Sequence, residues 1–340
     1  MNVAIRVDAD PRIGSGHFMR MIALAQMLRD AGHDATFVTA GRHPMGDAYL
    51  SDEALPVHEI PAGVDAAGDA RTLIGVATET RASWVVLDGA SFDEPYQRAV
   101  REAGFHLLSV DDYARGHFVS DVVLNQNDGS ERLTYSTAPY TTRLAGIRYV
   151  LLRREFRATP PPARDPRKRP LNVLVTLGGA QQRGLLSRTL DAVLTGGGDD
   201  VTVTLLIGAF QALEPDVEAV CARAAARVSV VRHNRRMAET MAAADVAVAG
   251  AGSTMWELLC MRVPFLAIPL DPAHEPFVER LVQDGLCAGA PLAHDLPAPR
   301  LVDLARGFLH DDVLRATILE RTAGLVDPRR AWRELSAVMR

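Results

Sequence analysis

Residues 6–20 bring together several side-chain types that could do chemistry. The stretch reads RVDADPRIGSGHFMR, so acids, glycines, a histidine and arginines follow a short apolar run. Imidazole titrates near neutral pH, which makes His17 a candidate general base, with a helix-capping or buried hydrogen-bonded histidine as the alternative. Gly14 and Gly16 would let a ligand approach the backbone near a helix start, where anions bind well.

Charged residues flank this histidine on both sides. Asp8 could orient the imidazole or hold a sugar hydroxyl, although a turn or helix-capping role also fits it. Arg6 has apolar neighbours, and a buried guanidinium needs partners, of which Asp8 is a candidate on the same strand face. Arg20 follows His17 by three residues, so the two would be neighbours on a helix surface.

The second candidate region is DVAVAGAGSTMWELL at 245–259. Gly252 ends a run of small residues, and the hydroxyls of Ser253 and Thr254 would form an anion site with the first amides of a helix. Glu257 could accept hydrogen bonds from two ribose hydroxyls. Thr254 and Glu257 also fit a T-x-x-E capping box, and the bare sequence favours that capping role.

Two weaker signals complete the set of candidates. Gly178 and Gly179 follow an apolar run and would admit a phosphate or a sugar, although a plain strand-to-helix turn is favoured when they are taken alone. Polar residues also follow apolar runs in the first half, where one rim of a sheet could gather them into a pocket for a hydroxylated ligand. They are Asp88, Asp111, Asp112, Asn125 and Asn127.

Two α/β halves are needed to position these residues. Short apolar runs alternate with helical patterns, which is typical of parallel sheets built from βαβ units. Residues 158–170 interrupt the alternation with proline and charge, and we interpret them as a solvated linker between domains at 1–157 and 171–340. The expected strands lie at 3–7, 34–40, 84–88, 106–112 and 121–127, and then at 171–180, 201–209, 228–233, 245–252 and 264–270.

Composition narrows the function classes. The net charge of −5 gives no general argument for nucleic-acid binding but permits a local site for a small anion. Three cysteines without a CxxC pair, and the lack of His/Cys zinc spacing, predict no metal site, and no cofactor is expected. Since neither a signal peptide nor a membrane-spanning run is recognised, we expect a soluble cytoplasmic protein. A monomer is favoured.

The opening stretch follows the pattern R-x-D-x-x-x-x-I-G-x-G-H-x-x-R. Together with GAGSTMWEL at 250–258, it resembles the UDP-2,4-diacetamido-2,4,6-trideoxy-β-L-altropyranose hydrolase family of pseudaminic acid biosynthesis, within the MurG-like glycosyltransferase superfamily. The resemblance extends from about residue 3 to about residue 290. It implies a GT-B fold, with two Rossmann-like domains facing across a cleft.

The resemblance also implies a UDP-sugar partner and a role for each candidate. His17 would deprotonate a water that attacks the anomeric carbon with inversion, which releases free sugar and UDP without a metal. The second domain would hold UDP, with the uracil near the backbone of Met237. The substrate-binding set would be Arg6, Asp8, Gly14, Gly16, Arg20, Asp88, Asn125 and Asn127, and the nucleotide-binding set Gly178, Gly179, Met237, Gly252, Ser253, Thr254, Glu257 and His274.

Three positions depart from the family pattern. Gln181 stands where an acid is expected, Gly89 where a histidine is expected, and Ala273–His274 where an Asn-Gln pair is expected. All are expected near the ligand, so the sugar and the acceptor stay open. The alternative is a UDP-sugar-dependent GT-B glycosyltransferase that passes the sugar to an alcohol or amine activated by His17. A non-catalytic nucleotide-sugar-binding protein is a third hypothesis.

Overall fold

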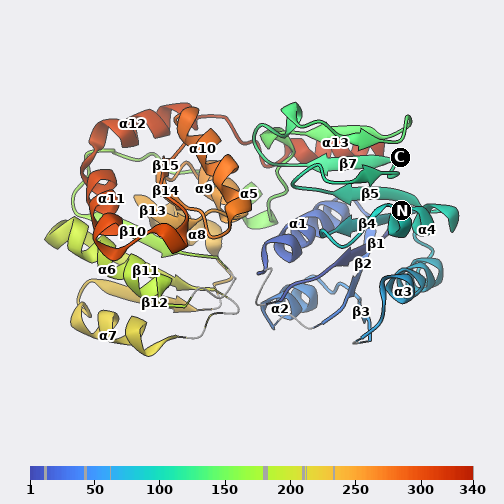
Figure 1. The fold of residues 1–340 in the computed structure, drawn as a ribbon, viewed down its shortest axis with the longest axis horizontal. Helices are drawn as coiled ribbons and strands as arrows, with labels where there is room; N and C mark the ends of the chain where they lie inside the picture. The colour runs from blue at the N-terminus through green and yellow to red at the C-terminus, as the bar shows by residue number, and fades with distance from the viewer. Residues whose placement is uncertain are drawn as a thin grey trace. The chain divides into compact units, whose positions relative to one another are not determined.

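The structure is a computed structural model of the 340-residue chain, and it forms two compact units (Figure 1). Unit 1 comprises Met1–Asp10, His17–Arg154 and Asp327–Arg340, whereas unit 2 comprises Pro11–Gly16 and Glu155–Val326. The structure describes all residues except 11–13, 42–43, 62, 179–182, 209–210, 212, 233 and 340, and the side chains of 44 and 45 are also not described.

Unit 1 contains a parallel sheet with the strand order β3-β2-β1-β4-β5-β7-β9 within the described residues. The strands are β1 (Asn2–Val7), β2 (Asp34–Thr39), β3 (Val57–Glu59), β4 (Trp84–Asp88), β5 (His106–Val110), β7 (Val122–Asn125) and β9 (Thr142–Ala145). The chain order reverses between β1 and β4, and in parallel sheets ligands bind beyond the carboxyl ends of strands at such a point. Val7 pairs with Asp88 there, so the ends of these two strands lie level.

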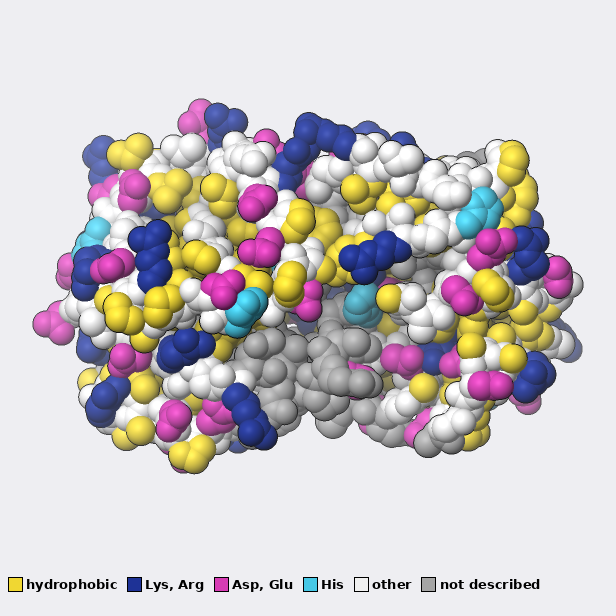
Figure 2. Space-filling view, viewed as in Figure 1, with side chains coloured by type: hydrophobic (Ala, Val, Ile, Leu, Met, Phe, Trp, Pro, Cys, Tyr) yellow, Lys and Arg dark blue, Asp and Glu magenta, His cyan; other side chains and the backbone are white. Residues whose placement is uncertain are grey.

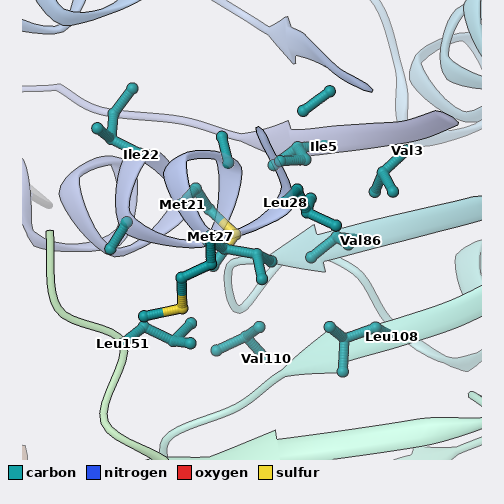
Figure 3. Close-up of a cluster of buried hydrophobic side chains, with 14 of the residues drawn as sticks. Val3, Ile5, Met21, Ile22, Met27, Leu28, Val86, Leu108, Val110 and Leu151 are labelled. Carbon is teal, nitrogen blue, oxygen red and sulfur yellow. The ribbon is translucent and has the colours of Figure 1, made fainter. Parts of the chain in front are cut away.

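Helices cover both faces of this sheet. They are α1 (Gly16–Asp30), α2 (Pro44–Asp52), α3 (Ala66–Glu79), α4 (Glu94–Glu102) and α13 (Arg330–Val338). Alternate residues of β1 point to opposite faces, as strand geometry requires. Val3 and Ile5 therefore pack with α1 residues such as Met21 and Leu28 (Figure 3), whereas Ala4 joins the cluster beneath α3 and α4.

The first helix begins earlier than its apolar pattern suggests. The continuous apolar helical pattern of the sequence begins at residue 21, but α1 starts at Gly16. His17 and Arg20 therefore lie in its first two turns, as their spacing on a helix surface predicts. The helix is buried from Phe18 to Leu28 and ends before Gly32, whose φ of +78° suits a residue without a Cβ.

Unit 2 repeats the doubly wound design with the parallel strand order β12-β11-β10-β13-β14-β15 in the described part of the chain. Its strands are β10 (Leu171–Thr176), β11 (Val201–Ile207), β12 (Val228–Arg232), β13 (Val246–Gly250), β14 (Phe265–Ile268) and β15 (Ala288–Gly289). Its helices are α6 (Leu185–Gly197), α7 (Pro215–Arg223), α8 (Met237–Ala243), α9 (Thr254–Cys260), α10 (Glu275–Gln283), α11 (Ala298–His310) and α12 (Asp312–Arg321). The order reverses between β10 and β13, so the loops after these two strands are the equivalent ligand position.

The C-terminal segment returns to the first unit. The sequence suggested a second domain that runs to residue 340, but Asp327–Arg340 belongs to unit 1. Ala331 and Leu335 on α13, and Met339 directly after it, are buried in the same apolar cluster as α1. An amphipathic helix packs wherever its apolar stripe is covered, and sequence position alone does not determine which sheet covers it.

The segment 158–170 contains no buried residue, as expected for a solvated linker, but its basic side chains also make specific contacts. A short helix, α5 (Arg154–Ala158), leads into the segment. The segment belongs to unit 2, and its basic side chains bind other parts of that unit. Lys168 Nζ lies 2.7 Å from Asp245 Oδ2, and Arg164 donates to four backbone carbonyls. Proline and charge correctly predict the lack of regular structure, but they carry no information about tertiary partners.

Charges of both signs are interspersed on the face drawn in Figure 2, in keeping with the small net charge. Among the described residues, no helix is long and apolar enough to cross a membrane.

Candidate active site

His17 and Asp88 meet at the point where the strand order of unit 1 reverses. His17 lies in the first turn of α1, after β1, and Asp88 is the last residue of β4. His17 Nδ1 is 2.7 Å from Asp88 Oδ1. The Asp88 side chain is fully buried, whereas the His17 side chain keeps 31% of its exposure. A buried carboxylate thus holds one edge of an imidazole that remains accessible to solvent.

Arg20 binds the same carboxylate from the next turn of α1. Its Nε and Nη2 lie 2.6 Å from Asp88 Oδ2 and Oδ1, which is a bidentate arrangement. The same guanidinium lies 2.8 Å from Asp112 Oδ1 and 3.0 Å from Asp112 Oδ2. Arg20 is 7% exposed. Arg20 lies beside His17, as the helical spacing predicts. Its guanidinium binds the carboxylates of Asp88 and Asp112 inside unit 1.

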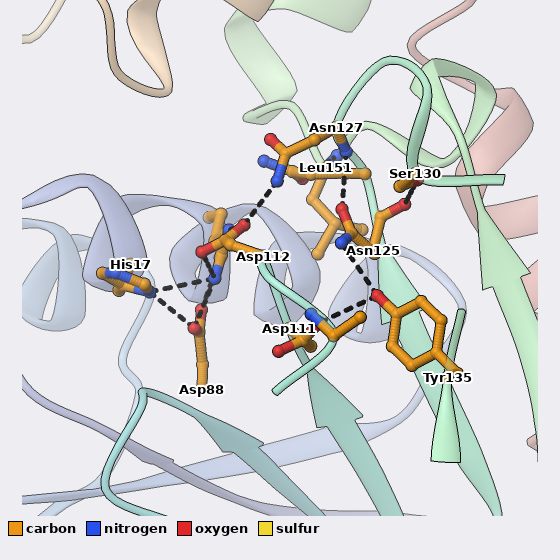
Figure 4. Close-up of polar contacts among 12 residues, drawn as sticks. His17, Asp88, Asp111, Asp112, Asn125, Asn127, Ser130, Tyr135 and Leu151 are labelled. Atoms are coloured by element: carbon orange, nitrogen blue, oxygen red, sulfur yellow. Dashed lines mark hydrogen bonds and ion pairs between the residues drawn. The ribbon is translucent and has the colours of Figure 1, made fainter. Parts of the chain in front are cut away.

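The network continues through the residues that follow β5 and β7 (Figure 4). Asn127 Nδ2 donates to Asp112 Oδ1 over 2.9 Å, and its backbone N–H donates to Asn125 Oδ1 over 3.0 Å. Asn125 Nδ2 in turn donates to the Tyr135 hydroxyl, which donates to Asp111 Oδ2. The five strand-end residues expected on one rim thus belong to the same region of contacts.

Most of these strand-end residues support the site from inside. Asn125 is completely buried, and both ends of its amide have protein partners. Asp88 is likewise buried and oriented toward Arg20 and His17. We therefore propose a positioning role for Asp88 and Asn125 in place of the direct substrate contact expected from the sequence. Asp8 had been one candidate to orient His17, and Asp88 makes that contact instead.

The electrostatics keep the carboxylates ionised and favour a protonated imidazole. Burial acts to raise the pKa of Asp88 and of Asp112, but the Arg20 guanidinium outweighs it and holds both pKa values below the usual range. Burial acts to lower the pKa of His17, but the Asp88 carboxylate opposes it, and the net pKa lies above 6.5. Arg20 limits this rise because its own charge repels an imidazolium.

Arg6 and Asp8 belong to a separate, partly buried cluster on the side of β1 opposite α1. Arg6 is 2% exposed and pairs with Asp8, as the same-face spacing predicts. Arg6 Nε and Nη2 also bind Asp69 of α3, whose Oδ1 accepts from the Tyr96 hydroxyl of α4. Asp8 Oδ1 further accepts from the Ala40 backbone N–H after β2, over 2.7 Å. Sequence reasoning missed Asp69 and Tyr96, because no local spacing connects them to β1.

The loop after β13 does not form the capping box suggested by its sequence. Thr254 is the first residue of α9, and Ser253 is the N-cap residue, with no side-chain hydrogen bond to the helix. Glu257 therefore lies one position too far along for the reciprocal contact. Gly252 is exposed, and a Cβ added there would meet no atom within 4 Å.

The remaining nucleotide-binding candidates lie in loops of unit 2. Met237 begins α8 and is buried, and the next backbone N–H, that of Ala238, donates to Glu155 Oε2 over 3.0 Å. His274 precedes α10 on the loop after β14. Gly178 follows β10 with a φ of +79°, which favours glycine.

Several expected positions carry backbone features of their own. Gly14 has a φ of +73°, so a side chain there would strain the backbone, and Gly16 begins α1. Gly89 is one of the positions that depart from the family pattern, and a Cβ added there would lie 3.1 Å from the Phe92 ring. Ala273 donates its backbone N–H to Asp271. Gly179 and Gln181 lie outside the described residues.

No group of three or more His, Cys, Asp or Glu residues in the described part of the chain is arranged to hold a metal ion.

No protein-family model matches the chain. In sequence, the chain is 23% identical over 279 residues to the uncharacterized protein MJ1062 of Methanocaldococcus jannaschii. The aligned stretch covers 79% of this chain and 55% of that protein. The chain thus spans about half the length of this relative.

Solved structures match over nearly the whole chain. MurG of Acinetobacter baumannii has a TM-score of 0.66 at 18% identity, and the match covers 99% of both chains. The glycosyltransferase SnogD from Streptomyces nogalater has a TM-score of 0.64 at 18% identity, also over 99% of both chains. A putative UDP-N-acetylglucosamine 2-epimerase from Listeria monocytogenes has a TM-score of 0.65 at 13% identity, over 99% of this chain and 95% of that one.

The fold is GT-B. Units 1 and 2 are its two parallel-sheet α/β domains, which confirms the fold class expected from the sequence. The GT-B neighbours named above are glycosyltransferases and a putative epimerase, so they do not select hydrolysis. The narrower resemblance to the pseudaminic acid hydrolases stays a prediction.

Proposed function

We propose that this protein is a glycosyltransferase that takes a sugar from a nucleotide donor and passes it to a small-molecule acceptor. The observation that carries the proposal is the His17–Asp88 pair, in which a buried carboxylate orients an accessible imidazole beyond the carboxyl ends of β1 and β4. The glycosyltransferases among the structural neighbours support this choice over water as acceptor. UDP is the proposed donor nucleotide, on the sequence resemblance.

His17 would serve as the general base. With Nδ1 donating to Asp88, the lone pair on Nε2 can take the proton from an acceptor hydroxyl or amine. The acceptor atom then bonds to the anomeric carbon while the bond from that carbon to the diphosphate oxygen breaks, and its electron pair leaves with UDP. A single displacement of this kind inverts the anomeric configuration.

Residues of unit 2 would hold the nucleotide. We assign the diphosphate to the loop after β13 with Ser253 and Thr254, and the ribose to Glu257. The lack of a side-chain cap on α9 supports this assignment, because capping does not use the Ser253 hydroxyl. Gly178, Met237 and His274 complete the proposed set together with Gly252 and, outside the described residues, Gly179. Hydrogen bonds aimed at the leaving diphosphate would stabilise the charge that develops there.

Hydrolysis of a UDP-linked amino or deoxy sugar is the second candidate. The observation that favours it is the opening motif, in which Arg6, Asp8, His17 and Arg20 occur together. Water would replace the acceptor, and His17 would play the same part. The structure gives Arg6 a buried pairing role, so the motif does not report a substrate contact at every position.

Product analysis tests the proposal. The protein is incubated with a panel of UDP-sugars, first alone and then with alcohol or amine acceptors, and UDP and free sugar are quantified by chromatography. Release of UDP that requires an acceptor, together with a glycosylated product, supports the transferase. Equal amounts of UDP and free sugar without acceptor support the hydrolase instead. If wild-type protein binds UDP but releases none from any donor with any acceptor, the catalytic proposal fails and a binding role replaces it.

A further inference from the structure

One nitrogen of Arg20 has three candidate partners for two hydrogens. Nη2 lies 2.6 Å from Asp88 Oδ1 and 3.0 Å from Asp112 Oδ2. The same nitrogen lies 2.9 Å from His17 Nδ1. A guanidinium NH₂ group carries two hydrogens. One of the three neighbouring atoms therefore cannot accept a hydrogen bond from Nη2.

The charges decide which acceptor is left out. Both carboxylates are ionised, and a charge-assisted hydrogen bond to an anion is stronger than one to a neutral nitrogen. The two Nη2 hydrogens therefore point to Asp88 and Asp112. Nδ1 of His17 must then carry its own hydrogen and donate it to Asp88 Oδ1 over 2.7 Å. In the neutral ring, the lone pair is consequently on Nε2.

We propose that Asp112 is a positioning residue that supports the tautomer of His17 set by Asp88, because it occupies the second Nη2 hydrogen of Arg20 and so removes the competing donor to Nδ1. Without this carboxylate, that hydrogen is available to Nδ1 at 2.9 Å and competes with the Nδ1–Asp88 bond, so the population shifts toward the ring whose hydrogen is on Nε2. Asp112 touches neither the imidazole nor a reacting atom, so it acts only through Arg20. Asn127 holds Asp112 in place from the other side, over 2.9 Å.

Asp112 also sets the charge next to the base. Asp88 and Asp112 carry two negative charges against the single positive charge of Arg20, so the group has one net negative charge before His17 is counted. A proton taken up at Nε2 makes the group neutral. These three residues are the charged groups that bear most on His17 in the described part of the chain. Loss of Asp112 therefore removes a charge that stabilises the imidazolium.

The tautomer can be read without any substrate. The ¹⁵N–¹H correlation pattern of the His17 ring is recorded above its pKa in wild type, Asp112→Asn and Asp112→Glu. We expect a protonated Nδ1 in wild type, a shift toward protonated Nε2 in Asp112→Asn, and the wild-type pattern again in Asp112→Glu. In Asp112→Asn, Oδ1 keeps its two donors, so the new NH₂ group faces Arg20 Nη2, where the acceptor used to be.

The matched control is Asp121→Asn. Asp121 is a partly buried carboxylate of the same unit, held by Arg101 and by the Leu107 backbone N–H beside the first residue of β5, at the opposite end of the strand. Its loss removes the same charge without touching Arg20, so the ring pattern of His17 stays as in wild type. Should Asp112→Asn fail to fold, Asp112→Ser is measured instead, because it also removes the acceptor.

The kinetic consequence rests on the proposed function, whereas the tautomer does not. We expect kcat to fall about tenfold or more in Asp112→Asn, with an unchanged KM for the donor and an acid limb of the pH profile moved to lower pH. An unchanged ring pattern in a folded Asp112→Asn protein overturns the inference even if the enzyme is active. A shifted pattern in a protein without any turnover keeps the inference and rejects the proposed function.

Discussion

The guanidinium of Arg6 binds both carboxylate oxygens of Asp69, which lies 63 residues away in the sequence. Nε is 3.0 Å from Oδ1, and Nη2 is 2.7 Å from Oδ2. The ring of Phe92 lies beside the guanidinium, 5.2 Å from its carbon to the ring centre. The pair therefore joins β1 to α3 within an otherwise apolar layer, next to the strand end that leads to His17.

Breaking this pair is expected to destabilise unit 1. Asp69→Asn leaves Asp8 as the remaining carboxylate partner of the 2% exposed Arg6, so we expect the loss of the charge-assisted pair with Asp69 to cost about 1.5–3 kcal/mol. Urea unfolding followed by circular dichroism gives the free energy of unfolding. The exposed ion pair Arg98–Glu94 on α4 serves as control, and Arg98→Ala should leave the midpoint unchanged. Equal midpoints for both variants would mean that the buried pair contributes nothing to stability.

The raised pKa of His17 predicts opposite trends for stability and activity. The folded-state pKa lies above 6.5, so the protonated ring stabilises the fold below pH 6.5, and this contribution is lost as the pH rises through the folded pKa. A general base works only when deprotonated, so kcat/KM should rise with pH through the same folded pKa. An NMR titration of the ring gives the folded-state pKa, and the pH profile of kcat/KM gives the pKa that controls activity. A common midpoint above 6.5 agrees, and one at or below 6.5 contradicts the charge balance described here.

Most strands of both sheets could be predicted from sequence because strands buried on both faces are rich in apolar residues, but the short edge strands β3, β9 and β15 were missed. The expected strand at 84–88 coincides with β4, and the expected strand at 171–180 begins with β10; both are mostly apolar. The apolar pattern alone would start α1 too late, because its first two turns also carry glycine, histidine and arginine. Charged residues become buried in a helix only where tertiary partners compensate them.

The candidate site divides in the same way. The residue types at strand ends and the Arg20–His17 spacing are local properties, and the sequence contains both. The partners that decide their roles come from elsewhere: Asp88 reaches His17 across 71 residues, and Asp112 reaches Arg20 across 92. Such pairings depend on the strand order of the sheet, which a pattern of apolar runs does not determine. Asp69 and Tyr96 were missed for that reason.

Removal of the Glu257 carboxylate tests the nucleotide assignment. We expect Glu257→Ala to weaken UDP binding roughly 10- to 100-fold, since a hydrogen bond to a charged group contributes about 1.5–3 kcal/mol. Isothermal titration calorimetry with UDP gives the Kd, and Glu239→Ala on the exposed part of α8 is the control. His17→Ala should instead lower kcat and leave the Kd for UDP near that of wild type. An unfolded Glu257→Ala protein whose folded fraction still binds UDP normally would assign Glu257 to the helix and not to the ligand.

Arg164 anchors the segment 158–170 to unit 2 without any carboxylate. Its guanidinium donates to the carbonyl oxygens of Met241 and Met261 over 2.7 Å, to Ala244 over 3.0 Å and to Arg262 over 3.3 Å. Met241 lies in the last turn of α8 and Ala244 directly follows it, whereas Met261 and Arg262 follow α9. At helix C-termini, carbonyls lack partners in the helix and the dipole attracts a cation. Burial lowers the pKa of Arg164 to about 10, so it still carries its charge at neutral pH.

Loss of Arg164 should release the segment and weaken unit 2. We expect Arg164→Ala to lower the free energy of unfolding by about 2–4 kcal/mol, because the carbonyls that it binds lose charge-assisted partners in a region shielded from water. Limited proteolysis should then cut within 158–170 faster than in wild type. Arg164→Lys restores the charge but not the planar fork, so it should recover only part of the loss. Arg167→Ala changes an exposed residue of the same segment and is the control. Cleavage at equal rates in both alanine variants would contradict an anchoring role for Arg164.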